Sequence, residues 1–110
     1  NEEGELVINQ VHTHTGLDHK TIRKYLANES KIGKDKLMAI CGGLKLPYQV
    51  SIHLLESEGY AVSTSKNEVD RIYTLLLTQH TYSGLIKWNE VIVRTGRTDL
   101  LFTEPKYDEP

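Results

Sequence analysis

Apolar side chains recur at helical spacing in six separate stretches of this chain. Each stretch repeats them three or four residues apart, which gives a helix one apolar face, and glycine or proline often separates one stretch from the next. No alternating pattern of comparable strength indicates a strand. The sequence therefore predicts an all-α fold of about six helices, at residues 5–14, 19–27, 34–44, 48–58, 67–79 and 83–95.

The same spacing selects the residues that face the core. In the first three helices they are Leu6, Val7 or Ile8, Val11, Ile22, Tyr25, Leu26, Leu37, Ile40, Cys41 and Leu44. In the last three they are Val50, Leu54, Leu55, Val69, Ile72, Tyr73, Leu75, Leu76, Leu85, Ile86, Trp88, Asn89 and Ile92. Small residues in the third helix, such as Gly42 and Gly43, leave room for close neighbours. Residues 100–102 are expected to fold back onto this core.

Several residues mark where the predicted helices begin and end. Gly16 suits the positive φ of a tight turn after the first helix. Asp18 is a good N-cap for the second helix, because its carboxylate can accept an N–H of the first turn. Asn67 or Ser65 could cap the fifth helix, and Gly96 ends the sixth.

Composition narrows the class of protein. A length of 110 residues fits one domain, and no apolar run approaches the ~18 residues that a membrane span requires. The single cysteine, Cys41, excludes an internal disulfide and suits the reducing cytoplasm. The sequence opens without Met or a signal peptide, and we expect it to be cut from a longer chain.

Positive charge is concentrated in one stretch, although the whole chain carries a net charge of −2. Residues 17–36 hold six basic side chains against three acidic ones, a local net charge of +3, whereas residues 1–16 hold three acids and no Lys or Arg. A basic patch on an acidic body can meet phosphates. A solvated helix face would give the same pattern.

Residues 11–26 carry the most informative pattern. Val11 lies in the first helix, and Gly16 follows five positions later. The apolar side chain of Leu17, which comes next, can fill the core at the turn. Asp18 caps a second helix whose buried side begins with Ile22. Two short helices joined in this way form a helix-turn-helix, in which the second helix can enter a DNA major groove.

These residues resemble a known family. Gly16-Leu17-Asp18-x-x-Thr21-Ile22-x-x-Tyr25 is similar to the Gly-Val-Ser-x-x-Thr-Ile-Ser-x-Tyr pattern of Xre/lambda-repressor-like regulators. Residues 32–47 resemble the helix that follows the recognition helix in that family. Residues 48–102, with the pair Asn89-Glu90, are similar to a C-terminal extension of some Firmicute members.

The resemblance implies a lambda-repressor-like fold and a transcription regulator that binds specific DNA sequences, often as a homodimer. We therefore divide the chain into a helix-turn-helix portion at 1–59, a helical extension packed on it at 60–102, and a flexible tail at 103–110. The chain departs from the family in lacking its first helix, and in having His12 and Thr15 where Ala and an apolar residue are usual. Either residues beyond this chain complete the domain, or the last two helices cover the same surface.

The second helix, 19–27, supplies the predicted contacts to bases. His19 and Lys20 lie in its first turn, where side chains reach base edges, and Lys20 can donate to O6 and N7 of guanine. Arg23 lies one turn further along the groove. Thr21 either bonds a phosphate or covers the turn.

Phosphate contacts are predicted on both sides of that helix. Lys24, Lys31 and Lys34 would hold the DNA backbone and make binding depend on salt. Asn9 and Gln10 in the first helix would also touch the backbone, as polar residues there do in the family.

Three other functions compete with DNA binding. Zinc binding is disfavoured because His12 and His14 stand at i and i+2, which do not face each other on a helix. No nucleophile elbow or glycine-rich phosphate loop indicates an enzyme, and no cofactor is implied. The stronger alternative is a protein-interaction or dimerisation module whose helix-turn-helix no longer binds DNA, with aromatic residues of the last helices at its interface.

Overall fold

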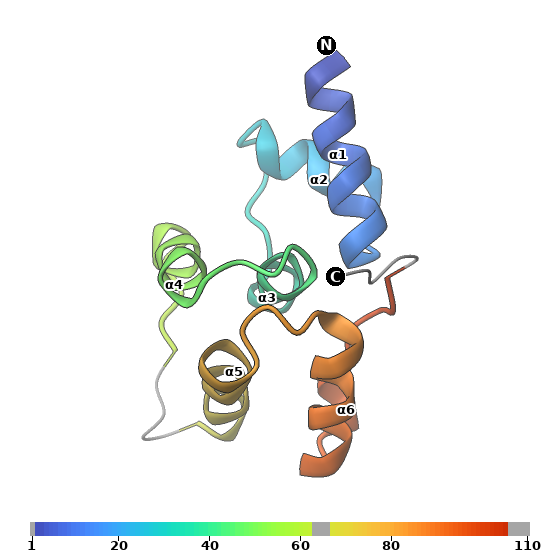
Figure 1. Cartoon of the computed structure of the whole chain (residues 1–110). Coiled ribbons are helices and arrows are strands. Elements are labelled where there is room, and N and C mark those ends of the chain that lie inside the picture. The colour runs from blue at the N-terminus through green and yellow to red at the C-terminus, as the bar shows by residue number, and fades with distance from the viewer. Residues whose placement is uncertain (1, 63–66, 106–110) are drawn as a thin grey trace.

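A computed structural model describes residues 2–62 and 67–105. These residues form six α-helices and one short 3-10 helix, with no strand among them (Figure 1), which confirms the predicted all-α fold of about six helices. The helices are α1 (Glu2–Thr15), α2 (His19–Leu26), α3 (Lys34–Gly43), α4 (Tyr48–Ser57), α5 (Glu68–Gln79) and α6 (Leu85–Thr95), followed by η1 (Thr98–Leu100). None of the helices within these ranges is long and apolar enough to cross a membrane.

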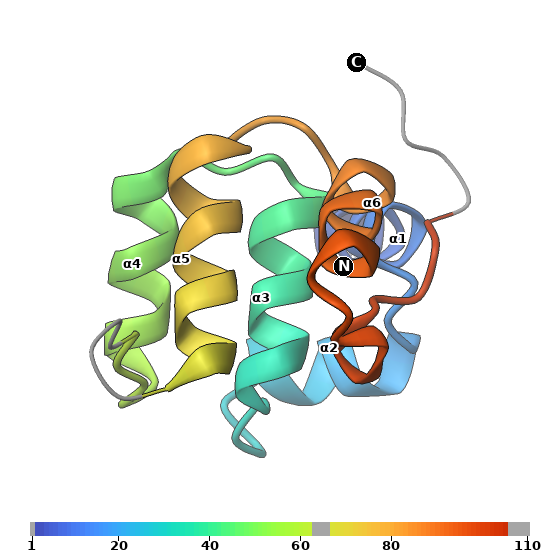
Figure 2. The ribbon, with the colours of Figure 1, turned by 90° about the horizontal axis from the view of Figure 1, so that it is seen from below.

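Helix α3 is the centre of the fold. Every residue from Leu37 to Gly43 is buried, because α1, α4 and α6 all pack against this helix (Figure 2). A Cβ on Gly42 would lie 2.7 Å from side-chain atoms of Leu85 and Trp88, and one on Gly43 would collide with the carbonyl oxygen of His14. The prediction that these glycines allow close neighbours is confirmed.

Residues that the sequence predicted to cap helices do so in the structure. The Asp18 carboxylate accepts the Lys20 N–H at 3.3 Å, and the Asn67 side chain accepts the N–H groups at the start of α5. Ser65, the other candidate cap, lies outside the described residues. Gly16 and Gly96 have φ values of +74° and +82°, so both helix ends use the left-handed conformation that glycine tolerates.

Several predicted core positions are wrong. Leu26 is 51% exposed and Val50 is 44% exposed, because α2 packs chiefly on α1, and α4 packs chiefly on α3 and α5. A helix at the edge of the fold buries one narrow face, which is Ile22 in α2, and Ser51 with Leu55 in α4. Leu75 and Ile86, which were also predicted to face the core, are exposed as well.

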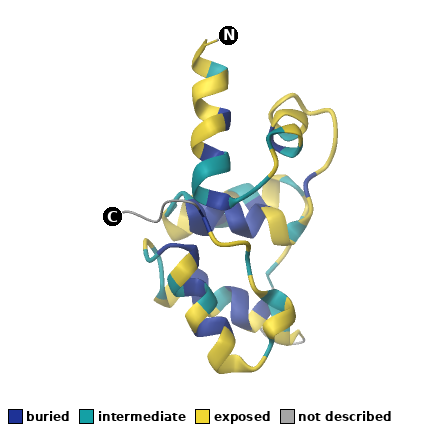
Figure 3. Ribbon diagram, turned by 90° about the vertical axis from the view of Figure 1, so that its right-hand side faces the viewer, coloured by how far each residue is buried: buried dark blue, intermediate teal, exposed yellow. Residues whose placement is uncertain are grey.

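The outer half of α1 projects from the body of the protein (Figure 3). The helix begins at Glu2, earlier than predicted, and buries Ile8 and Val11. Leu6 and Val7 are 59% and 46% exposed, so the prediction that Leu6 faces the core is wrong, and Ile8 rather than Val7 is the core residue. Helices α5 and α6 therefore do not cover this part of α1.

The C-terminal segment folds back onto α6 and the turn between α1 and α2. The Asn89 amide donates to the Phe102 carbonyl at 2.9 Å and accepts the Phe102 N–H at 2.8 Å. The Phe102 ring lies 5.9 Å from the Trp88 ring. Leu100 and Phe102 pack against the core as expected, while Leu101 is 43% exposed.

Part of the segment predicted to be a flexible tail is described. Pro105 is buried, and Thr103 lies so close to the turn that a Cβ on Gly16 would be 2.8 Å from its Cγ2. Residues 106–110 lie outside the described part of the chain.

Candidate nucleic-acid interface

The turn between α1 and α2 is fixed by hydrogen bonds from one buried side chain. The Thr15 hydroxyl donates to the Val11 carbonyl at 2.6 Å and accepts the Leu17 N–H at 3.1 Å. Thr15 is only 1% exposed, so these bonds are shielded from competing water. A threonine at this position thus orders the turn from within, where an apolar residue could only fill space.

Two histidines join α1 to α2. The His12 Nδ1 lies 2.7 Å from the Leu17 carbonyl oxygen, and because a carbonyl only accepts, the imidazole donates this bond. The His12 ring stacks on that of His19, with centroids 4.0 Å apart and planes inclined by 26°. The His19 Nε2 in turn lies 3.1 Å from the Asn9 Oδ1. The three side chains form a continuous strip across the helix pair.

Arg23 is held by an acid from α1. Its guanidinium donates to both carboxylate oxygens of Glu5, at 3.0 and 3.3 Å. The hydrogen bond and the positive charge of Arg23 lower the pKa of Glu5 below its usual value. Both side chains are about half exposed, and exposed ion pairs are weak. A phosphate or guanine that approaches α2 could therefore take Arg23 from Glu5.

Lys20 and Lys24 lie on the outward side of α2. Both residues are exposed, and neither ammonium group has a hydrogen bond or ion pair with the part of the chain that the structure describes. Thr21 lies between them in sequence and is half-buried. The outward side of α2 thus presents two cations whose charge is not neutralised by a neighbour.

Lys31 and Lys34 face a different part of the molecule. The Lys34 ammonium donates to the Ala61 carbonyl at 2.6 Å and to the Asp70 carboxylate at 2.7 Å. The Lys31 ammonium lies 4.8 Å from the centroid of the Tyr60 ring, a cation–π distance. These two lysines therefore connect the loop before α3 and its first turn to the segments around α4 and α5.

The predicted site residues thus separate into groups. Asn9, His19 and Arg23 lie together where α1 meets α2, and Lys20 and Lys24 extend from the exposed side of α2. Gln10 is exposed on α1 and lines a shallow hollow that Gly43 and Lys45 also line. Lys31 and Lys34 belong to the contact with α4 and α5.

Sequence reasoning missed two residues at this site. His12 stood out only as a departure from the family pattern, and its stacking partner is seven residues away. Glu5 gave no signal at all, because its pairing with Arg23 spans 18 residues and depends on how α1 crosses α2. Among the described residues, no group of three His, Cys, Asp or Glu side chains could hold a metal ion.

Comparisons of the chain with protein-family models, with curated proteins and with solved structures find no match. Its function must therefore be inferred from its own residues and from the geometry described above.

Proposed function

We propose that this protein is a cytoplasmic DNA-binding transcription regulator of the Xre/lambda-repressor-like kind, in which α2 enters the major groove. The observation that supports this most strongly is the outward side of α2. It presents Lys20 and Lys24 without partners in the described structure, on a helix whose orientation is fixed by the Thr15 hydrogen bonds and the His12–His19 stack.

Base recognition falls to the first turn of α2. Lys20 donates to O6 and N7 of guanine in the groove. His19 directly precedes Lys20 in the sequence, and the His19 ring is already oriented by Asn9 and His12. Arg23 joins these contacts when it exchanges the Glu5 carboxylate for a DNA acceptor, which keeps its charge paired throughout.

Affinity comes from phosphate neutralisation by the lysines near α2. The acidic first turn of α1, with Glu2, Glu3 and Glu5, opposes this attraction, so the basic surface is small. Each phosphate contact would lower the affinity about threefold between about 50 and 200 mM salt.

Fluorescence anisotropy with labelled random duplex DNA tests the proposal. Binding that weakens steeply between these two salt concentrations is the expected result. No binding at about 50 mM salt, from a sample shown to be folded by circular dichroism, would contradict it.

A protein-interaction module is the second candidate, and the exposed face of α1 favours it. Leu6 and Val7 leave apolar surface uncovered on a projecting helix, next to three glutamates that repel DNA. This surface would seat a protein partner or a second copy of the chain. Sedimentation velocity of the native protein and of the Leu6→Ser/Val7→Ser variant tests self-association, which the double variant should abolish.

A further inference from the structure

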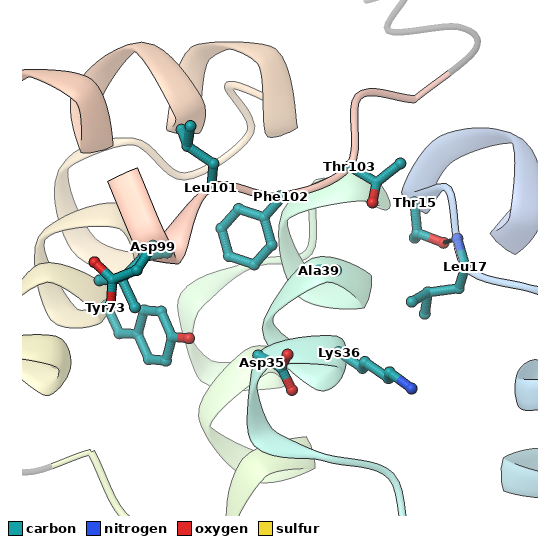
Figure 4. Close-up of a pocket in the computed structure, with 11 residues that line it drawn as sticks. Thr15, Leu17, Asp35, Lys36, Ala39, Tyr73, Asp99, Leu101, Phe102 and Thr103 are labelled. Atoms are coloured by element: carbon teal, nitrogen blue, oxygen red, sulfur yellow. Dashed lines mark hydrogen bonds between the residues drawn. The ribbon is translucent and has the colours of Figure 1, made fainter. Parts of the chain in front are cut away.

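A cavity of about 320 Å³ lies between the helix-turn-helix and the C-terminal segment. Its walls come from four parts of the chain: the α1–α2 turn, the first half of α3, α5, and residues 99–103 (Figure 4). Ligand sites in proteins usually occupy about 300–1,000 Å³ and often lie where separate structural units meet. The cavity therefore has the size and the position of a small-molecule site.

The Tyr73 hydroxyl is available to a ligand in this cavity. Tyr73 is 3% exposed, yet its hydroxyl makes no hydrogen bond within the described residues. Among the described residues, the fully enclosed side-chain polar atom without a partner is Ser51 Oγ, so the Tyr73 oxygen is open to the cavity that its side chain lines. Figure 4 shows the hydroxyl directed toward the side of α3 that carries Asp35 and Ala39.

The surroundings of this hydroxyl are negative. Burial, together with the charges of Asp35, Asp70 and Asp99, raises the pKa of Tyr73 to about 12, so the hydroxyl keeps its proton near neutral pH. Asp70 is paired with Lys34, and Asp99 with Arg97. Asp35 has no ion pair with any described residue and is the carboxylate left to receive a cation.

The remaining walls combine apolar and polar side chains. Leu17, Ala39 and Phe102 line the cavity beside the polar groups. Lys36 also lines it, but Figure 4 shows its side chain extending away from Tyr73. An anionic ligand would therefore meet Asp35 before it met a balancing cation.

We propose that this cavity binds a small organic amine with an apolar body. The ammonium group donates to the Asp35 carboxylate and to the Tyr73 oxygen, and the apolar body lies against Ala39 and Phe102. This site goes beyond DNA binding and does not depend on it. Its walls include Leu17 in the α1–α2 turn, so an occupied cavity would also stabilise the helix-turn-helix.

Three matched probes test the charge and the position of the ligand. The full chain, labelled with ¹⁵N, is titrated with phenethylamine, with the neutral 2-phenylethanol and with the anionic 3-phenylpropionate. Phenethylamine should shift the amide signals of residues 35–39 and 99–103 in a saturable way, and it should bind about tenfold or more tightly than either analogue.

Variants then separate this site from binding elsewhere. Asp35→Asn should weaken phenethylamine binding about tenfold and Tyr73→Phe should weaken it less, whereas the control Glu29→Gln, an exposed acid that does not line the cavity, should leave it unchanged. Since Asp35 is exposed, its variant should remain folded even if Tyr73→Phe does not. Absence of saturable binding, equal affinity for all three probes, or unaltered affinity in Asp35→Asn would each overturn the proposal.

Discussion

The imidazole rings of His12 and His19 lie 4.0 Å apart in a stacked arrangement that joins α1 to α2. His12 also donates to the Leu17 carbonyl, so one side chain contacts the turn and the helix that follows it. Regulators of the kind that the sequence resembles usually have a small residue at this position, which lets the two helices approach. Here the ring fills the same place and adds polar contacts.

Replacing His12 by Ala should destabilise the protein. The variant loses a half-buried hydrogen bond and the ring contact with His19, which together contribute roughly 1–2 kcal/mol. Urea unfolding followed by circular dichroism measures the change. The matched control is His53→Ala, since His53 is exposed on α4 and should change stability by less than about 0.5 kcal/mol. Equal effects of the two substitutions would contradict the role given to His12.

Gly43→Ala should be more damaging than Gly96→Ala. The new Cβ at position 43 would collide with the backbone carbonyl of His14, which cannot rotate away, and would lie 2.8 Å from Thr15 Cγ2. Overpacking of this kind costs about 3 kcal/mol. A Cβ on Gly96 would have no packing neighbour within 4 Å among the described residues, so only the left-handed backbone opposes alanine, at about 1 kcal/mol. Thermal unfolding of both variants shows which of them is less stable. A lower stability of Gly96→Ala than of Gly43→Ala would show that α1 and α3 do not pack this closely.

The Cys41 thiol should be unreactive in the folded protein. The thiol is 1% exposed, and burial raises its pKa. A reagent therefore cannot reach the sulfur, and little of the thiol is in the reactive thiolate form. Reaction with Ellman's reagent should be slow in buffer and fast in about 6 M urea. Ser30→Cys adds an exposed thiol as an internal reference. Comparable rates for the two thiols in buffer would contradict the burial of α3.

Tyr73 should make the protein less stable at alkaline pH. Its pKa is raised to about 12, chiefly by burial, against about 10 in the unfolded chain. The folded state therefore retains a proton that the unfolded state releases, and the resulting stability is present below pH 10 and is lost as the pH rises through 12. The stability of the native protein relative to Tyr73→Phe should fall by roughly 2 kcal/mol over this range. Urea unfolding of both proteins at pH 9.5 and pH 12 measures this difference, and a difference that does not change with pH would contradict it.

Features fixed by local chemistry could be predicted from the sequence. Asp18 and Asn67 cap the helices that follow them, and Gly16 ends α1, because each depends only on neighbouring backbone groups. The exposure of Leu26 and Val50 could not be predicted in this way. Their sequence spacing fits a helical face, but only the arrangement of neighbouring helices decides which face is covered.

The residues of the candidate site also divide into those that local sequence places and those that tertiary packing places. Lys20 and Lys24 could be placed on the outward side of α2 from helical spacing alone. The pairing of Arg23 with Glu5, and that of Lys34 with Asp70, join segments 18 and 36 residues apart. Such pairs depend on tertiary packing, so sequence reasoning assigned both cations to DNA without seeing their partners.

The measurement that tests the proposed function most directly is the DNA affinity of two charge-reversal variants with the same change in net charge. Lys20→Glu/Lys24→Glu reverses the exposed side of α2, and Arg71→Glu/Arg94→Glu reverses two exposed cations on α5 and α6. Measured by anisotropy at about 50 mM salt, the first variant should lose DNA binding, while the second should keep it within about threefold because its charges lie on helices that the proposal does not place against DNA. Equal affinities in the two variants would show that α2 is not the surface that meets DNA.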